Sequence, residues 1–426
     1  MTDNIRNSFI DDLLGLISIQ SVNGDSHGIK RCFDYIKSIA DRFGFCSRVC
    51  AQGMVLEVYP HNVPIVPKIG IITHVDTVPF DETKWTHNPL GEYVDGRIYG
   101  RGVLDDKVGV IYSLYAFKEL EEYIKPDWKI IIGSCEEGVW SDMKAYLGEG
   151  NTPPGFVITI DGDGIQNGCR GTLNIEMVFN CKSDHPYIKD FQTPNGVSNI
   201  VPDTVLIQLD DFVDEIKGKA AHSSAPENGI NAISVAYNKH MEVIANDFPD
   251  FAIFMDNYMS KPNALFIEEG GRIIRGQKDP GTIATPTMIK MKDGKLYVRV
   301  NVRLSPSIMS KQGFYFSLAK ARETYDCMIL VKEMVLPAFI HKDNEELIKM
   351  QDAYEEVMGH RAEVKIALGT GYNATFPNAA IFGPRFDDDD EKEEDLCHCP
   401  DESRSLDDIE KFYKILCGYI RRSLGR

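Results

Sequence analysis

The sequence lacks the features that direct a chain into a membrane or out of the cell. It has no run of about 18 consecutive apolar residues, so we expect no transmembrane helix. Near its N-terminus it has acidic residues, Asp3, Asp11 and Asp12, where a signal peptide has a basic region before an apolar core. Its ten cysteines do not have the spacing of a disulfide framework, which is typical of reduced thiols in a long chain. We therefore expect a cytoplasmic protein without an export signal.

A surplus of basic residues is also absent. The chain has 46 Lys and Arg against 64 Asp and Glu, a formal net charge of −18, and the acidic residues are spread along its whole length. This balance argues against nucleic acid or an anionic membrane surface as the main partner. The densest acidic run, at residues 387–395, is expected to be a solvated loop.

What the sequence does contain is enough apolar material for more than one core. The chain has 426 residues, of which 43% are hydrophobic and 26% charged, and this suits two or three domains. Nearly continuous apolar runs at residues 68–73, 128–134 and 155–160 are typical of strands buried on both faces of a parallel sheet. Helical patterns at residues 108–123 and 140–147 lie between these runs, which predicts an α/β domain with helices on both sheet faces.

The middle of the chain has a different pattern. From about residue 171, alternating strands are grouped with a few helices, one of them expected at about residues 231–246. This grouping predicts an α+β domain whose helices cover one face of an antiparallel sheet. After residue 337 the alternation of strands and helices returns, and a last helix is expected at about residues 406–423. The simplest architecture is an α/β catalytic domain with a mostly parallel sheet, split between residues 1–170 and 337–426. An α+β lid domain at residues 171–336 is then inserted between its halves.

Acids and histidines follow the predicted buried strands. His74 ends the first of them, and Asp76 points to the same side in an extended backbone, so Asp76 can accept the ring N–H of His74 and fix its tautomer for metal binding. Asp161 ends another strand, although Asp163 competes with it for the same role. His398 lies far downstream. Because the ends of parallel strands meet at one sheet edge, we expect these side chains to gather there.

Two acidic pairs complete this set. Asp105 and Asp106 follow a glycine turn at a predicted helix start, where they could serve as a helix cap or as a carboxylate that bridges two cations. Glu136 and Glu137 directly follow a buried strand, where an unpaired charge is costly to bury. Adjacent side chains diverge, so one of them can bind metal while the other faces a bound water.

The acids and histidines together predict a site for two metal ions. Each ion would receive nitrogen and oxygen ligands, and Asp105 would be shared; the ligands would be His74, Asp105, Glu137, Asp161 and His398. Imidazole with carboxylate suits zinc, manganese or cobalt, and the residues alone do not choose among them. The segment Cys397-His398-Cys399 suggests a thiolate zinc site instead, but no second cysteine pair has fitting spacing.

A glycine-rich segment offers another kind of binding site. Residues 369–374, GTGYNA, match the dinucleotide fingerprint in its alanine form, but Pro377 falls where the phosphate-binding helix needs its first turns, which argues against a nicotinamide site. We expect Gly369, Thr370 and Gly371 to offer backbone amides to a substrate carboxylate or oxyanion instead.

Five segments occur in an order that resembles one enzyme family. They are HVDTVP from His74, GRGVLDDK from Gly100, CEEG from Cys135, AAHSSAPENGINAI from Ala220 and HCPDE from His398. Together they resemble the co-catalytic metallopeptidase family that includes aminoacylases, carboxypeptidase G, the ArgE and DapE deacylases, the tripeptidase PepT and PepV-type dipeptidases. The resemblance covers nearly the whole chain.

The resemblance implies a role for each matching residue. His74 and Asp161 would hold one metal ion, and Glu137 and His398 the other. Asp105 would bridge the two ions, with a cis peptide bond to Asp106 as one option. Glu136 would be the general base, with Asp76 as the partner that orients His74. In the lid domain, His222 would stabilise the oxyanion.

Some features favour the PepV-type branch of this family. Asn199, in the segment NIVPD, precedes His222, as it does in PepV-type dipeptidases, and Arg303 would clamp a substrate carboxylate. The chain departs from the family pattern at Val108, where a glycine is usual, and in the glycine-rich segment. The implied function is a dipeptidase with two divalent metal ions, zinc first and manganese or cobalt as alternatives, acting on small peptides.

Two other functions stay open. An N-acyl amino acid deacylase would use the same site, because that site cleaves any amide next to a carboxylate. A catalytically silent peptide-binding protein would be expected to lack a metal ligand or the general base. The five ligands and the base Glu136 are all present, which argues against this function. The size of the lid domain allows a working monomer or a homodimer formed through that domain.

Overall fold

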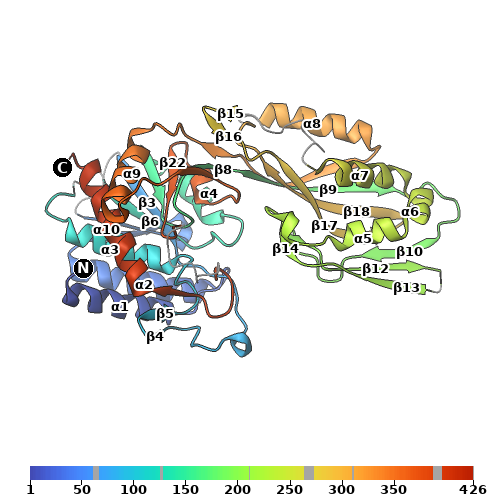
Figure 1. Ribbon diagram of the computed structural model, residues 1–426. Coiled ribbons are helices and arrows are strands. Elements are labelled where there is room, and N and C mark those ends of the chain that lie inside the picture. Colours follow the sequence, from blue (N-terminus) through green and yellow to red (C-terminus); the bar gives the residue numbers. More distant parts are fainter. Residues whose placement is uncertain are drawn as a thin grey trace. The chain divides into compact units, whose positions relative to one another are not determined.

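The computed structural model describes most of the chain in two compact units (Figure 1). The described residues are 1–60, 67–124, 128–210, 212–262, 273–308, 311–386 and 396–425, with the backbone alone at 311–313. The expected acidic loop at 387–395 lies outside them. None of the ten cysteines, all of which are described, forms a disulfide. Within the described ranges, no helix is long and apolar enough to cross a membrane.

The first unit is formed by two separated parts of the chain. It contains residues 1–168, 339–365 and 371–426, and the second unit contains residues 169–338 and 366–370. The second unit thus includes 366–370, whereas the sequence predicts that this segment belongs to the catalytic domain.

The first unit is built on a mainly parallel sheet. The central strands β6, β3, β7 and β22 are parallel to one another, whereas β1, β2 and β8 pair antiparallel with their neighbours. In sheet order the strands are β1 (Cys46–Cys50), β2 (Val55–Tyr59), β6 (Trp128–Gly133), β3 (Ile69–His74), β7 (Phe156–Thr159), β22 (Ala379–Phe382) and β8 (Ile165–Cys169). The strands expected from continuous apolar runs are therefore the three adjacent strands β6, β3 and β7.

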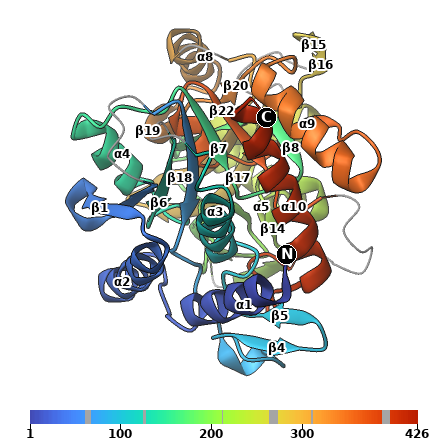
Figure 2. The ribbon, with the colours of Figure 1, turned by 90° about the vertical axis from the view of Figure 1, so that its left-hand side faces the viewer.

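Helices cover both faces of this sheet. On the larger face, α3 lies between α2 and α10 (Figure 2). The helices of that face are α1 (Asp3–Ile17), α2 (Ser26–Phe43), α3 (Lys107–Glu119), α9 (Glu345–Met358) and α10 (Leu406–Ser423). The opposite face packs on α4 (Ser141–Gly148). Within β3, Ile71 belongs to the core of the first face and Ile72 to that of the second, so alternate residues are buried on opposite sides.

A small sheet connects two loops that are far apart in sequence. It consists of β4 (Glu92–Val94), β5 (Arg97–Tyr99) and β23 (Ser403–Ser405), and β23 pairs antiparallel with β5. This pairing brings the segment after β5, which contains Asp105, close to the segment before β23, which contains His398.

The second unit is an antiparallel sheet with helices packed on one face, as the sequence predicts. In sheet order the strands are β13 (Phe212–Lys217), β12 (Thr204–Leu209), β10 (Ile188–Gln192), β17 (Ile283–Lys292), β18 (Lys295–Leu304), β9 (Gly171–Asn180) and β19 (Met328–Val335). The helices are α5 (Ala232–Lys239), α6 (Met241–Asp247), α7 (Pro249–Ser260) and α8 (Lys311–Thr324). Two further strands of the mainly parallel sheet, β20 (Ala338–Phe339) and β21 (Val364–Ala367), pair with β8. The remaining short strands form two pairs, β11 (Ile200–Val201) with β14 (Ala221–His222) and β15 (Ile273–Ile274) with β16 (Gln277–Lys278).

One helix of the second unit is divided where the sequence predicts continuity. The pattern at residues 231–246 predicts a single helix, but the structure has α5 and α6 with a break at His240. The backbone of His240 is not helical, and its Nε2 lies 2.7 Å from Oδ2 of Asp214 on β13. This polar contact accompanies the break, and nothing in the apolar periodicity indicates it.

Candidate metal centre and active site

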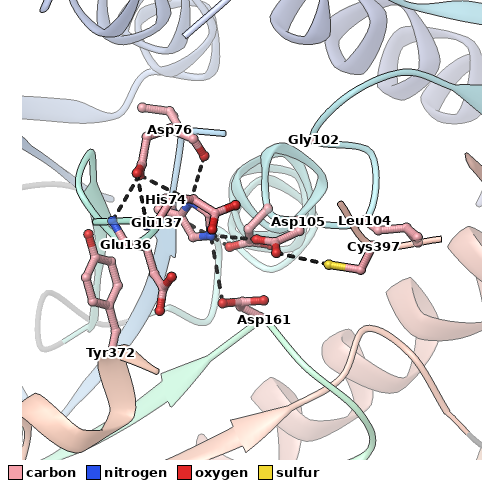
Figure 3. A network of polar contacts seen from close by, with 12 residues as sticks. His74, Asp76, Gly102, Leu104, Asp105, Glu136, Glu137, Asp161, Tyr372 and Cys397 are labelled. Atoms are coloured by element: carbon pink, nitrogen blue, oxygen red, sulfur yellow. Dashed lines mark hydrogen bonds and ion pairs between the residues drawn. The ribbon is translucent and has the colours of Figure 1, made fainter. Parts of the chain in front are cut away.

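His74 is the first element of the candidate site. It is the last residue of β3 and is fully buried. Its Nδ1 lies 2.9 Å from the backbone oxygen of Asp76 and 3.3 Å from Oδ1 of the same residue, and both atoms are acceptors, so Nδ1 can only donate (Figure 3). Its Nε2 then faces two other carboxylates, at 2.8 Å from Oδ1 of Asp105 and 3.8 Å from Oδ2 of Asp161.

The carboxylate of Asp76 connects β3 to the loop that follows β6. Its two oxygens accept the backbone N–H groups of Glu136 and Glu137, each at 3.1 Å, and Oδ2 also accepts Nδ2 of Asn23 at 2.7 Å. Burial favours the neutral form of this acid, but the contact with His74 and these hydrogen bonds lower the pKa of Asp76. Asn23 lies in the loop between α1 and α2, and no sequence pattern points to it.

Asp105 stands between two histidines. It lies just before α3, and its peptide bond to Asp106 is cis, as the resemblance allows. Its Oδ1 faces His74, whereas its Oδ2 lies 3.0 Å from Nε2 of His398 and 3.1 Å from Sγ of Cys397. Burial opposes ionisation of Asp105, but the imidazoles of His398 and His74 hold the pKa of this carboxyl well below its ordinary value.

Glu136 and Glu137 reach different ends of the cluster. The ligand atoms of Glu136, His74 and Asp161 lie within 4.8 Å of one another. Oε1 of Glu137 lies 3.0 Å from Nε2 of His398. Burial and then the negative charge of Asp161 raise the pKa of Glu136 well above its ordinary value. Burial and then Asp105 raise the pKa of Glu137. The two acids therefore diverge, as expected for neighbours in the chain.

Of the two competing aspartates, the structure brings only Asp161 to the cluster. Asp161 faces His74 after the end of β7. Asp163 instead accepts Nε of Arg385 at 2.7 Å, and 63% of its side chain is exposed. Only Gly162 lies between these aspartates, and the bend there directs their carboxylates to different surroundings.

A buried ion pair holds the Asp105 and His398 loops together. Oε1 of Glu402 accepts the backbone N–H groups of Gly102 at 3.0 Å and Leu104 at 2.8 Å, while Oε2 accepts Nη1 of Arg101 at 2.6 Å. Nη2 of Arg101 donates to the backbone oxygen of His398 at 3.1 Å. The sequence assigns no role to Arg101 or Glu402, although both lie within the matching segments.

Tyr372 supports the loop that carries Glu136 and Glu137. Its hydroxyl donates to Oδ2 of Asp142, and the same oxygen accepts the backbone N–H groups of Ser134 at 2.7 Å and Cys135 at 3.0 Å. A Cβ at Gly133 would lie 2.4 Å from this hydroxyl, so a side chain there would displace Tyr372. Tyr372 lies within the glycine-rich segment, directly after Gly371, and begins a 3₁₀ helix at Tyr372–Thr375.

The glycine-rich segment is divided between the two units. Gly369 and Thr370 belong to the second unit and Gly371 to the first. In the first unit, a Cβ at Gly371 would lie 3.6 Å from Oε1 of Glu136, so this glycine borders the candidate base.

The other substrate-binding candidates surround Arg303 in the second unit. Arg303 lies on β18 with 6% exposure, and its guanidinium lies 2.9 Å from Oγ1 of Thr172 and 3.5 Å from Oγ1 of Thr370. Its Nη2 lies 3.4 Å from Nε2 of His222, which is exposed. Asn199 adjoins β11, whose Ile200 pairs with His222 on β14.

The electrostatic surroundings of Arg303 differ from those of an ordinary buried arginine. The hydrogen bonds described for its guanidinium go to hydroxyl, amide and imidazole groups, and no ion pair with a carboxylate is described for it. Burial and then the charge of Arg170 lower its pKa to about 10. A carboxylate ligand would supply the negative charge that no described ion pair gives to Arg303.

The split α/β unit carries a cluster of acids and histidines that is typical of a metal-dependent hydrolase. Residues 70–422 match the model of peptidase family M20/M25/M40, and the chain belongs to this family. The resemblance inferred from the ordered segments is thereby confirmed, as is the assignment to metallopeptidases, whose chemistry relies on divalent metal ions.

Individual relatives agree with this family. A protein of Staphylococcus haemolyticus, provisionally named a dipeptidase, is 26% identical over 446 residues, which covers 91% of each chain. The structure of a di-peptidase from Saccharomyces cerevisiae matches with a TM-score of 0.63 at 12% identity, covering 100% of this chain and 97% of that one. Aminoacylhistidine dipeptidase from Vibrio alginolyticus also matches with a TM-score of 0.63, at 13% identity, over 99% and 97% of the two chains. At these identities the two structures show the shared fold.

Proposed function

We propose that this protein is a dipeptidase whose active site holds two divalent metal ions. The observation that carries the proposal is the position of Asp105, which turns one carboxylate oxygen to His74 and the other to His398. Each of these histidines also faces a second acid, Asp161 for His74 and Glu137 for His398. One carboxylate between two histidine–acid pairs is the arrangement that a shared bridging ligand requires.

The chemistry of the donors supports metal ions in this place. Four carboxylates and two imidazoles gather in a partly buried cluster, and their negative charge is balanced by no Lys or Arg in the ion pairs described for them. His74, Asp105 and Asp161 would hold one ion, and Asp105, Glu137 and His398 the other. Bound there, divalent ions act as Lewis acids that polarise a carbonyl and lower the pKa of water.

Glu136 is the proposed general base. Its raised pKa suits a group that accepts a proton near neutral pH, and its carboxylate lies at the His74 and Asp161 end of the cluster. In the proposed reaction, Glu136 takes a proton from the water that attacks the scissile carbonyl. It then delivers this proton to the leaving amine, so that the base is regenerated.

Residues of the inserted lid domain are proposed to recognise the substrate. Arg303 would bind the free carboxylate of a dipeptide, since it is a buried cation surrounded by neutral polar groups. His222 would stabilise the oxyanion formed from the carbonyl, and its exposed ring is consistent with a group that meets a ligand. Asn199, Gly369, Thr370 and Gly371 would add polar contacts to the peptide.

The test compares Glu136→Gln with Asp163→Asn in the metal-loaded protein. Both changes replace a carboxylate by its amide, but Asp163 forms its ion pair with Arg385 away from the cluster. We expect both variants to keep the wild-type metal content, measured by elemental analysis. Dipeptide hydrolysis should fall by about 10²–10⁴-fold in Glu136→Gln only. Turnover within about tenfold of wild type in Glu136→Gln would refute the role of the base.

Substrate choice is tested with the wild-type protein. An unblocked dipeptide and an N-acetyl amino acid both have an amide next to a carboxylate. On the acyl side of that amide, the dipeptide has a residue with a free amino group, whereas the other compound has only a methyl group. We expect the dipeptide to have the higher kcat/KM. A preference for the N-acetyl amino acid would replace the dipeptidase assignment by that of a deacylase.

A further inference from the structure

A cysteine side chain faces the candidate metal centre beside His398. Sγ of Cys397 lies 3.1 Å from Oδ2 of Asp105, the same oxygen that lies 3.0 Å from Nε2 of His398. The ligand atoms of Asp105, Cys397 and His398 all lie within 4.8 Å of one another. Cys397 therefore belongs to the His398 end of the cluster and not to its surface surroundings.

A fourth donor points to the same place. Oε1 of Glu137 is buried, and no hydrogen bond to it is formed within the described part of the chain. It lies 3.0 Å from Nε2 of His398, so these two donor atoms are side by side. Donor atoms bound to one zinc ion at about 2.0–2.3 Å lie side by side in this way, each directed at the ion rather than at its neighbour.

The backbone explains how two adjacent side chains reach one point. In an extended strand, Cys397 and His398 would point to opposite sides. Here they lie in a turn in which His398 has a left-handed backbone, with φ of 64°. A non-glycine residue adopts this conformation at a cost of about 1–2 kcal/mol. Arg101 holds the turn by donating to the backbone oxygens of His398 and Cys399.

We propose that Cys397 is a thiolate ligand of the metal ion that Asp105, Glu137 and His398 hold. This inference rests on the proposed metal centre and specifies the chemistry of one of its two sites. On binding, the thiol loses its proton to solvent, and sulfur donates an electron pair to the ion. The resulting donor set has one sulfur, one nitrogen and two oxygen atoms.

A thiolate makes the two ends of the centre unequal. Sulfur is a soft ligand that favours zinc over manganese, whereas the other end offers only imidazole and carboxylate donors. With Cys397, four side chains would hold the ion at the His398 end, compared with three at the His74 end. Glu136, the proposed base, lies at the His74 end.

Cobalt substitution tests this inference directly. The full-length protein is stripped with a chelator and titrated with Co²⁺, and its absorption is followed in the visible and near-ultraviolet. Thiolate ligation produces a near-ultraviolet charge-transfer band that carboxylate and imidazole ligands do not produce. We expect this band in the wild type and in Cys399→Ser, the matched control, because Cys399 is exposed and does not belong to the group of Asp105, Cys397 and His398.

The band should disappear in Cys397→Ser while the visible cobalt absorption remains. Cys397→Asp, which restores a charged ligand without sulfur, should bind cobalt and also lack the band. Competition between Zn²⁺ and Mn²⁺ should show the preference for zinc at one site falling by more than about tenfold in Cys397→Asp.

The outcomes separate this inference from the proposed function. Cobalt bound to the wild type without a near-ultraviolet band, or a band that persists in Cys397→Ser, overturns the role of Cys397 and leaves the metal centre intact. A wild-type protein that binds no cobalt overturns the metal centre itself.

Discussion

Replacement of Glu402 by alanine should destabilise the first unit and loosen the metal centre together. Glu402 is fully buried, and its carboxylate accepts hydrogen bonds from Arg101 and from the backbone of Gly102 and Leu104. Burial raises its pKa to about 7 even with Arg101 in contact. The change leaves the Arg101 guanidinium buried without its carboxylate and removes the acceptor of two backbone N–H groups that precede Asp105.

The expected magnitude follows from the burial of both partners. Arg101 is 4% exposed and Glu402 is 0% exposed, so this is a buried pair from which one partner is removed. Such a loss typically costs about 3–5 kcal/mol, because the remaining charge has no compensation. For a folding unit of this size, about 2–4 °C of Tm accompanies each kcal/mol, so we expect Tm to fall by about 6–20 °C.

The assay is thermal unfolding of the metal-stripped protein, followed by circular dichroism, together with metal affinity at a temperature where the variant is folded. Glu355→Ala is the matched control. Glu355 also pairs with an arginine, Arg361, at 3.0 Å, but 49% of the Glu355 side chain and 43% of the Arg361 side chain are exposed. Loss of such a surface pair costs about 0–1 kcal/mol.

We expect the Glu402 variant to bind metal ions more weakly as well, because Arg101 also contacts the backbone of His398. A Tm within about 2 °C of wild type with unchanged metal affinity would refute the reasoning, because it would mean that this pair holds neither loop.

Two other groups give separate predictions. Glu57 is buried against Lys129. Burial opposes ionisation of this acid, but Lys129 lowers the pKa of Glu57 below its ordinary 4.5. The stabilisation that the ionised Glu57 gives to the folded state is therefore present above pH 4.5 and is lost as the pH falls through the folded pKa. Glu57→Gln should cost about 3–5 kcal/mol at pH 7 and less at pH 4, measured by urea unfolding; an equal difference at both pH values would contradict this. Arg303→Lys should lower kcat/KM about 10–100-fold for a dipeptide but not for its C-terminal amide, because a bidentate contact to a carboxylate is lost. Equal losses for both substrates would contradict this.

The elements predicted most accurately from the sequence are those whose burial is continuous. Strands β3, β6 and β7 are buried on both faces, so their apolar runs are unbroken, and the amphipathic α10 matches residues 406–423. The edge strand β1 is not predicted, because its residues are mostly exposed and include Ser47 and Arg48. Helix α7 is missed as well, since Pro249 starts a new helix only two residues after α6 ends.

The gathering of acids and histidines follows from the sequence for a topological reason. The carboxyl ends of β3, β6 and β7 meet at one edge because these strands are parallel, and His74, Glu136 and Asp161 follow those ends closely. The supporting contacts depend instead on how loops pack. Arg101 and His398 are 297 residues apart, and no spacing rule indicates that the guanidinium of one meets the backbone of the other.

The contacts of Asp76 show why the parts of this centre cannot be treated independently. From the sequence, Asp76 is expected to orient His74, and in the structure its backbone oxygen lies closer to Nδ1 than its carboxylate does. The carboxylate of Asp76 instead contacts the loop after β6, where it accepts the backbone N–H groups of both Glu136 and Glu137. One residue thus fixes a ligand at the His74 end, the proposed base, and a ligand at the His398 end. A role limited to the tautomer of His74 is therefore too narrow, because displacement of Asp76 would move all three groups at once.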